Sequence, residues 1–284
     1  MASQQLQPAS YENPAAMVGP EGLATNPFPP VMNAYYTYSL AGLKSITLCG
    51  ASEKDRIFCV ETHTGYSGKP PLGTRPGILI HNGPSLKDPI HAAAGDESMA
   101  AARQYHFSLN SVVLLPPLDD VIDSGMENMV TEVMHAHTVP GDKDAVAFRF
   151  EIEVGNAASG KRRREEFEWR SVKKGDKDPD AERGGFKLFH LGSEGEATGG
   201  ENSTSNNLIR AEKEDKVNAV LAWSKITAIK HAFSLQIKGP GLSGLFGERW
   251  TLMVVATALR IWVLHGTGRT TRTGIRMGEK LRNK

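Results

Sequence analysis

Apolar residues recur along the chain in short runs, rich in β-branched and aromatic side chains and bounded by glycine, proline, asparagine or aspartate. This pattern is typical of β-strands. The alternation of apolar and charged residues is clearest in residues 148–154 (FRFEIEV), which predicts a strand with one buried face and one solvent-exposed face. Short, turn-rich connections such as HNGPSLKD indicate antiparallel hairpins. The expected runs lie near residues 35–40, 45–50, 57–62, 77–81, 90–94, 104–109, 111–115, 129–137, 146–154, 165–171, 186–191, 217–224 and 229–237.

One segment departs from this pattern. Residues 248–264 (ERWTLMVVATALRIWVL) are apolar on nearly every side and predict a helix that stops near Gly266 and Gly268. Such a helix needs apolar surroundings on all sides. Arg260 interrupts the run, which is shorter than the roughly 20 residues of a membrane span, so a protein core is favoured and no transmembrane span is expected. Arg260 itself should either reach the edge of that core or pair with an acidic residue.

A closed sheet of about twelve strands has room for a central helix, whereas a barrel of about eight strands is filled by its own side chains. We therefore predict a mainly β (α+β) protein, a closed antiparallel β-barrel of about twelve strands around the hydrophobic helix. The barrel is expected over residues 34–268. Residues 1–33 are proline-rich and predict a disordered leader, and residues 269–284 predict a basic flexible tail. Polar stretches at 155–164, 173–184 and 193–216 are expected to be loops.

Net charge and cysteine content limit which classes of partner and which cellular compartments fit this sequence. The 284 residues carry 33 basic and 32 acidic side chains, a net charge of +1, so no overall field draws the protein to nucleic acid and no nucleic-acid partner is predicted. The first residues lack a basic region followed by an apolar core, so we expect a cytoplasmic protein, with peripheral membrane or nuclear association left open. Cys49 and Cys59 are too few for a disulfide scaffold, and the sequence leaves open whether they form one bridge.

Three segments carry a resemblance to a known family: GERWTLMVVATALRIWVL, ILIHNGPSLKDPIHAAA and the strand REEFEWR at residues 164–170. Over roughly residues 33–268 the chain resembles fungal tubby C-terminal-like proteins, which are similar to the tubby, phospholipid scramblase and LURP-one-related superfamily. The resemblance implies a twelve-stranded barrel enclosing a hydrophobic helix, and binding of membrane phospholipid or phosphoinositide. No PPxY motif and no palmitoylation cysteine cluster is present, and the resemblance transfers no ligand-contact residue.

Two basic clusters are the candidate lipid- or anion-binding residues, since an anionic membrane surface attracts local groups of Lys and Arg. One is the block Lys161, Arg162, Arg163 and Arg164. The other lies in the tail and comprises Arg269, Arg272, Arg276, Lys280 and Arg282. The alternative interpretations are a solvated loop balanced by neighbouring glutamates and a solubilising tail.

Two histidines carry the main enzymatic alternative. His135 and His137 are two residues apart, so on a strand both project from one face, as the metal-binding pair of cupin-like barrels does. The glutamate of the cupin pattern is missing from the residues that follow, and two surface histidines are the simpler interpretation.

Together with the resemblance, the sequence therefore predicts a non-enzymatic protein that binds anionic phospholipid membranes and needs no cofactor. The alternatives are a cupin-like metal-dependent enzyme and a protein–protein adaptor.

Overall fold

The computed structural model describes residues 28–39, 42–97, 110–118, 126–139, 142, 145–155, 162–175, 178–192, 217–224 and 230–276. Its strands are β1 (Val31–Ser39), β2 (Gly42–Cys49), β3 (Arg56–His63), β4 (Gly77–His81), β5 (Ile90–Asp96), β6 (Asn110–Leu115), β7 (Val130–Thr138), β8 (Val146–Val154), β9 (Arg163–Val172), β10 (Gly185–Gly192), β11 (Val217–Trp223) and β12 (His231–Ile237). Its helices are the 3-10 turns η1 (Met126–Asn128) and η3 (Gly239–Ser243) and the long helix α3 (Glu248–Gly266).

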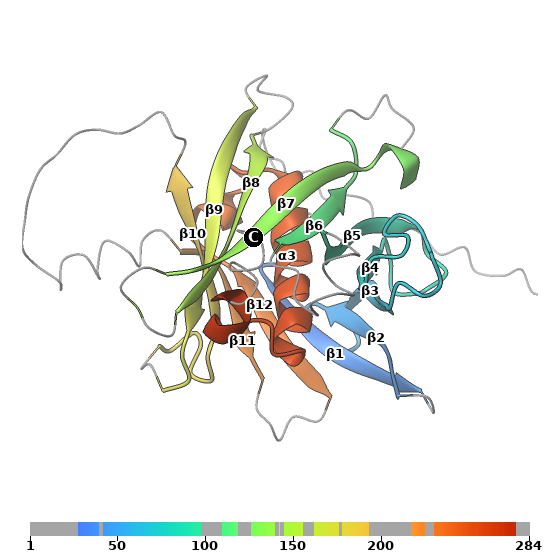
Figure 1. Ribbon diagram of the computed structural model, residues 1–284, viewed down its shortest axis with the longest axis horizontal. Helices are drawn as coiled ribbons and strands as arrows, with labels where there is room; N and C mark the ends of the chain where they lie inside the picture. Colours follow the sequence, from blue (N-terminus) through green and yellow to red (C-terminus); the bar gives the residue numbers. More distant parts are fainter. Residues whose placement is uncertain are drawn as a thin grey trace, which may run out of the picture.

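The twelve strands form one closed antiparallel barrel (Figure 1). Each strand pairs with its neighbours in the sequence, and β1 pairs with β12 to close the sheet. This confirms the predicted fold class. Hairpins between consecutive strands are the arrangement that short connections allow, and closure gives each of the twelve strands a neighbour on both sides.

Period-two alternation separates the inner face of the barrel from the outer face. On β8 the inward side chains Phe148, Phe150 and Ile152 are almost completely buried, whereas the outward Glu151 is exposed. The inward residues join those of the other strands in a single large hydrophobic cluster. That cluster includes most of α3, so the core lies inside the barrel.

Helix α3 fills the barrel (Figure 1). Every residue from Trp250 to Ile261 is buried, so the helix is covered on all sides by the inner faces of the strands. At about 1.5 Å per residue, its 19 residues span roughly 28 Å. It continues two residues beyond the expected end at residue 264, and Gly268 then adopts a φ of 72°, in the left-handed region that favours glycine.

Polar contacts fix the position of α3 in the barrel. The indole Nε1 of Trp169 on β9 donates to Thr257 Oγ1 in the middle of the helix at 3.0 Å. Arg260 pairs with an acidic residue, which was one of the two alternatives predicted from the sequence. Its guanidinium donates to Asp96 at the end of β5, and its Nε donates to Ser111 Oγ at 2.9 Å.

The boundaries of the body differ slightly from those expected. Strand β1 begins at Val31, and Met32 is fully buried, so residues 31–33 belong to the barrel rather than to the leader. The expected run at 104–109 lies outside the described residues, as do residues 1–27 of the leader. Cys49 and Cys59 are both buried and do not form a disulfide bond.

The barrel has two ends, which we name after the helix. At the entry end, η3 leads into α3, and β7 begins and β8 finishes there. At the exit end, α3 stops at Gly266, and β10 begins and β11 finishes there. The candidate residues are distributed between these two ends.

Candidate functional site at the entry end of the barrel

The basic block lies at the entry end, where β9 begins. Arg162 is exposed and donates to the Leu118 carbonyl at 3.2 Å. Arg163 donates to the buried carboxylate of Glu165, although 71% of its own side chain remains exposed. Lys161 lies outside the described residues. Two arginines of the block therefore present exposed guanidinium groups at this end.

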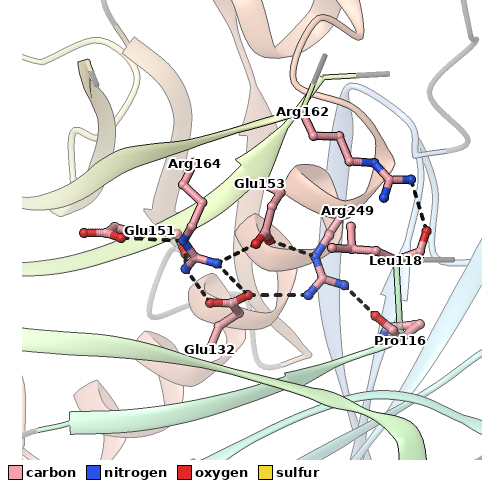
Figure 2. A network of polar contacts seen from close by, with 8 residues as sticks. All are labelled: Pro116, Leu118, Glu132, Glu151, Glu153, Arg162, Arg164 and Arg249. Carbon is pink, nitrogen blue, oxygen red and sulfur yellow. Dashed lines mark hydrogen bonds and ion pairs between the residues drawn. The ribbon is translucent and has the colours of Figure 1, made fainter. Parts of the chain in front are cut away.

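Arg164 has a different environment, because strands β7 and β8 separate beside it. Their pairing covers Met134–Thr138 of β7 and Val146–Phe150 of β8, so the entry-end parts of both strands diverge. The Arg164 side chain lies at this opening (Figure 2). It donates to Glu132 at 2.8 Å and to Glu153 at 2.6 Å.

A second arginine completes this network from inside the barrel. Arg249, in the first turn of α3, lies 3.5 Å from both Glu132 and Glu153 and donates to the Pro116 carbonyl (Figure 2). Strands β7, β8 and β9 and the start of α3 are thereby joined by two guanidiniums and two largely buried carboxylates. We call these four residues, Glu132, Glu153, Arg164 and Arg249, the entry network.

The pKa values follow from these contacts. Hydrogen bonding to Glu132 raises the pKa of Arg164 further above its already high value. Partial burial favours the protonated form of Glu153, but hydrogen bonds and the nearby charges of Arg164 and Arg249 outweigh that effect and lower its pKa. The two arginines and two glutamates of the network are thus paired with one another. Arg164 is thus occupied by structural ion pairs, whereas Arg162 and Arg163 face outward.

The glycine-rich segment before α3 forms a projecting loop beside Arg162. Its two leucines are among the most exposed large apolar residues described, Leu242 at 52% and Leu245 at 67%. Phe246 holds the loop in place: its ring is buried 4.9 Å from Trp250, and its carbonyl accepts a hydrogen bond from Gly155 N. The turn into α3 requires Gly247, which has a φ of 83° and would place a Cβ 2.9 Å from the Gly155 carbonyl.

A cavity of about 390 Å³ separates this loop from the basic block. Arg162 and Arg249 line it together with Gly244 and Gly247 of the loop, which shows that the loop and the block are neighbours. Glu153 and Glu248 line it too, so the cavity itself is electrically mixed. The distinctive feature of this end is therefore a loop with two exposed leucines that shares a cavity with the exposed Arg162.

The tail arginines lie at the opposite, exit end. Arg269 donates to Asp96 at 2.7 Å, and Arg272 donates to the Asp142 carbonyl. Residues 272–276 are helical, with Ile275 buried in the core and Arg276 exposed. Lys280 and Arg282 lie outside the described residues. The first part of the segment expected to be a flexible tail is therefore packed against the barrel, and the two basic clusters face in opposite directions.

The histidine pair projects from the outer face of β7, as the period of two predicts. His135 is exposed, and His137 Nε2 lies 3.2 Å from the carboxylate of Glu168 on β9. Arg149 and Arg170 donate to the same carboxylate at 2.9 and 2.6 Å. Within the described ranges, no group of three or more His, Cys, Asp or Glu side chains is arranged to hold a metal ion.

Protein-family models, curated proteins and solved structures all gave no match to this chain. No helix in the described part of the chain is long and apolar enough to cross a membrane.

Sequence reasoning identified the basic block but missed its neighbours. Leu242 and Leu245 gave no signal, because a leucine beside glycines can be buried as readily as exposed. The partners of Arg164 and Arg249 were also missed, since Glu132 is 32 and 117 residues away from them in the chain.

Proposed function

We propose that this protein binds anionic phospholipid membranes peripherally through the entry end of the barrel. The observation that carries the proposal is the exposure of Leu242 and Leu245 on an anchored loop that lines one cavity with Arg162, the neighbour of the exposed Arg163. Apolar side chains that enter the acyl boundary while adjacent basic side chains contact phosphates are the usual composition of peripheral membrane contacts. The resemblance to tubby-like and scramblase-like proteins supports the same ligand class.

The magnitudes decide which residues dominate the contact. Full burial of a leucine is worth about 1.5–3 kcal/mol, whereas a basic residue near an anionic surface contributes about 1 kcal/mol. Because the two leucines are half to two-thirds exposed, they can still gain a large part of that energy. We therefore assign most of the affinity to the leucines and the preference for anionic lipid to the arginines.

The packing of the loop is consistent with this role. Phe246 anchors it, which lowers the cost of ordering the loop backbone on binding. Arg164 and Arg249 are held in the entry network and are not expected to contact lipid. The tail arginines Arg269 and Arg272 face the other end and cannot act on the same membrane surface.

Co-sedimentation with vesicles tests the proposal. Full-length protein and the variants L242S/L245S and R162Q/R163Q are mixed with vesicles of phosphatidylcholine alone, or with added phosphatidylserine or phosphoinositide, at low and physiological salt. We expect L242S/L245S to bind about tenfold more weakly to all anionic vesicles, and R162Q/R163Q to lose the preference for anionic over neutral lipid. Salt should weaken the wild-type contact.

The matched control is Y66S, because Tyr66 is 93% exposed but lies in the connection between β3 and β4 at the exit end. It should bind vesicles like the wild type. Undiminished binding by L242S/L245S, or an equal loss in Y66S, would contradict the assignment to the entry end. Absence of binding by the wild type to every vesicle would remove the proposed function.

A further inference from the structure

A second cavity, of about 320 Å³, lies at the exit end of the barrel, on the far side of α3 from the leucine loop. Three aromatic residues from different elements line it: Tyr36 of β1, Trp223 of β11 and Trp262 of α3. Two cations, Lys174 and Arg183, also line it. Its size is within the range of small-molecule sites.

The aromatic side is formed by rings that hold one another in place. Tyr36 and Trp262 pack with their ring centroids 5.8 Å apart. Trp223 stacks on His265 at 4.5 Å with an interplanar angle of 15°. His265 in turn shares a hydrogen bond with Thr270 Oγ1 at 3.0 Å. A flat ligand would therefore meet preorganised ring faces.

Arg183 is presented by a turn that is fixed to the same sheet. The turn is closed by the Gly184 amide, which donates to the Ala181 carbonyl at 2.8 Å, and Ala181 is buried. The turn is tied to β11 because Trp223 N donates to the Gly184 carbonyl at 3.2 Å. Arg183 is consequently half-buried beside an aromatic ring of the cavity.

The charges of this cavity are not compensated within it. Neither the Lys174 nor the Arg183 side chain makes an ion pair or hydrogen bond in the described part of the chain, in contrast to the arginines of the entry network. None of the nine lining residues carries a carboxylate. Asp180 and Glu182 line a neighbouring cavity, which shares Arg183, Trp223 and Ser224 with this one, and Asp180 is already paired with Lys238 at 2.5 Å.

The carbonyl groups at the end of α3 do not offset this positive charge, because they already accept hydrogen bonds from the chain itself. The amides of Thr267, Gly268 and Arg269 donate to the carbonyls of Val263, His265 and Leu264 at 2.8–3.2 Å. The last turn is thus capped by its own chain, and its acceptors are satisfied.

We infer that the exit-end cavity is a binding site for a small planar organic anion, a carboxylate or phosphate carried on an aromatic or otherwise flat body. Lys174 and Arg183 would hold the anionic group through charge-assisted hydrogen bonds, and Tyr36, Trp223 and Trp262 would contact the flat body. The site is independent of the proposed membrane contact, because it lies at the other end of the barrel.

Calorimetric titration of the full-length protein with naphthoate, and with naphthylmethanol as its uncharged counterpart, tests this site. We expect naphthoate to bind about tenfold more tightly than naphthylmethanol, and K174Q/R183Q to lose about tenfold in naphthoate affinity while its affinity for naphthylmethanol is unchanged. The matched control K54Q/R56Q removes an exposed Lys and Arg at the entry end and should leave both affinities unchanged. Equal affinities for the two probes, or the same loss in the control, would overturn the inference.

The four tryptophans provide a readout that needs no variant. Trp223 and Trp262 line the cavity, whereas Trp169 and Trp250 are fully buried in the core. Naphthoate should shift the indole N–H signals of Trp223 and Trp262 in an NMR spectrum and leave the other two in place. Shifts of the Trp169 and Trp250 signals alone would contradict the site.

The L242S/L245S variant should keep naphthoate binding even where it loses vesicle binding, so the two proposals can fail separately.

Discussion

Arg260, in the middle of the enclosed helix, donates a hydrogen bond to the carboxylate of Asp96 at the end of β5, and both side chains are almost completely buried. Burial lowers the pKa of Arg260 to about 10 against the opposing effect of Asp96, so the guanidinium is still charged at neutral pH. A charge enclosed in this way is tolerated only with a partner. This pair is therefore one of the polar contacts that tie the helix to the sheet within a largely apolar core.

Removal of the carboxylate should be strongly destabilising. The D96A variant leaves Arg260 charged in the core, and we expect it to lose about 3–5 kcal/mol of unfolding free energy, measured by urea denaturation. The double variant R260M/D96A removes both charges and should lie closer to the wild type than D96A does. A D96A protein within about 1 kcal/mol of the wild type would show that this ion pair does not hold the helix.

The hydrogen bond between Trp169 and Thr257 provides a second, uncharged test of the helix position. Replacing Thr257 with valine keeps the shape but removes the acceptor for Trp169 Nε1, which is buried on all sides. We expect T257V to cost about 1–3 kcal/mol in thermal or urea unfolding, the cost of an unsatisfied buried donor. The pair T257V/W169F should show a coupling in a double-mutant cycle, because without the indole nitrogen the loss of the hydroxyl matters less. Strict additivity would argue that the two groups do not interact.

These contacts show where sequence reasoning succeeds and where it stops. Alternation in residues 148–154, short turn-rich connections and an all-apolar helix are local signals, and they were enough to predict a closed barrel with a filled centre. Arg260 signalled that an acid was needed, but its partner Asp96 is 164 residues away, and no local pattern points to it. The exposed leucines of the entry-end loop and the exit-end cavity depend on exposure and on neighbours from several strands, which only the assembled barrel determines.

Acid should unfold the protein partly through Glu168. Burial alone would raise the pKa of this carboxyl, but hydrogen bonds from His137, Arg170 and Arg149 outweigh it and lower the pKa to about 2. Because the folded pKa lies below the unfolded value, the resulting stability is present above about pH 4.5 and is lost as the pH falls towards 2. We expect E168Q to be less stable than the wild type at pH 7, by at most about 3 kcal/mol, and the difference to shrink below pH 3.

The neighbouring Glu166 supplies the control for this titration. It pairs with Arg149 at 3.2 Å, but its side chain is 26% exposed, and it has one such partner where Glu168 has three. E166Q should therefore follow the wild-type pH profile closely in thermal unfolding. If E166Q and E168Q changed the profile equally, the acid sensitivity could not be assigned to the cluster around Glu168.

The start of the basic tail should contribute to stability through packing rather than through charge. Ile275 is 1% exposed and belongs to the main core cluster, whereas the next residue, Arg276, is exposed. Truncating a buried isoleucine to alanine leaves a cavity and typically costs about 2–5 kcal/mol. We expect I275A to lower the unfolding free energy by an amount in the lower half of that range, because residues 272–276 pack from the open end of the barrel and can adjust. R276A should leave the unfolding free energy unchanged.

Both variants should bind vesicles like the wild type, since the proposed membrane contact lies at the other end. A stable I275A protein would mean that the residues after the helix do not seal the exit end, and a loss of vesicle binding in R276A would move the membrane contact to the tail.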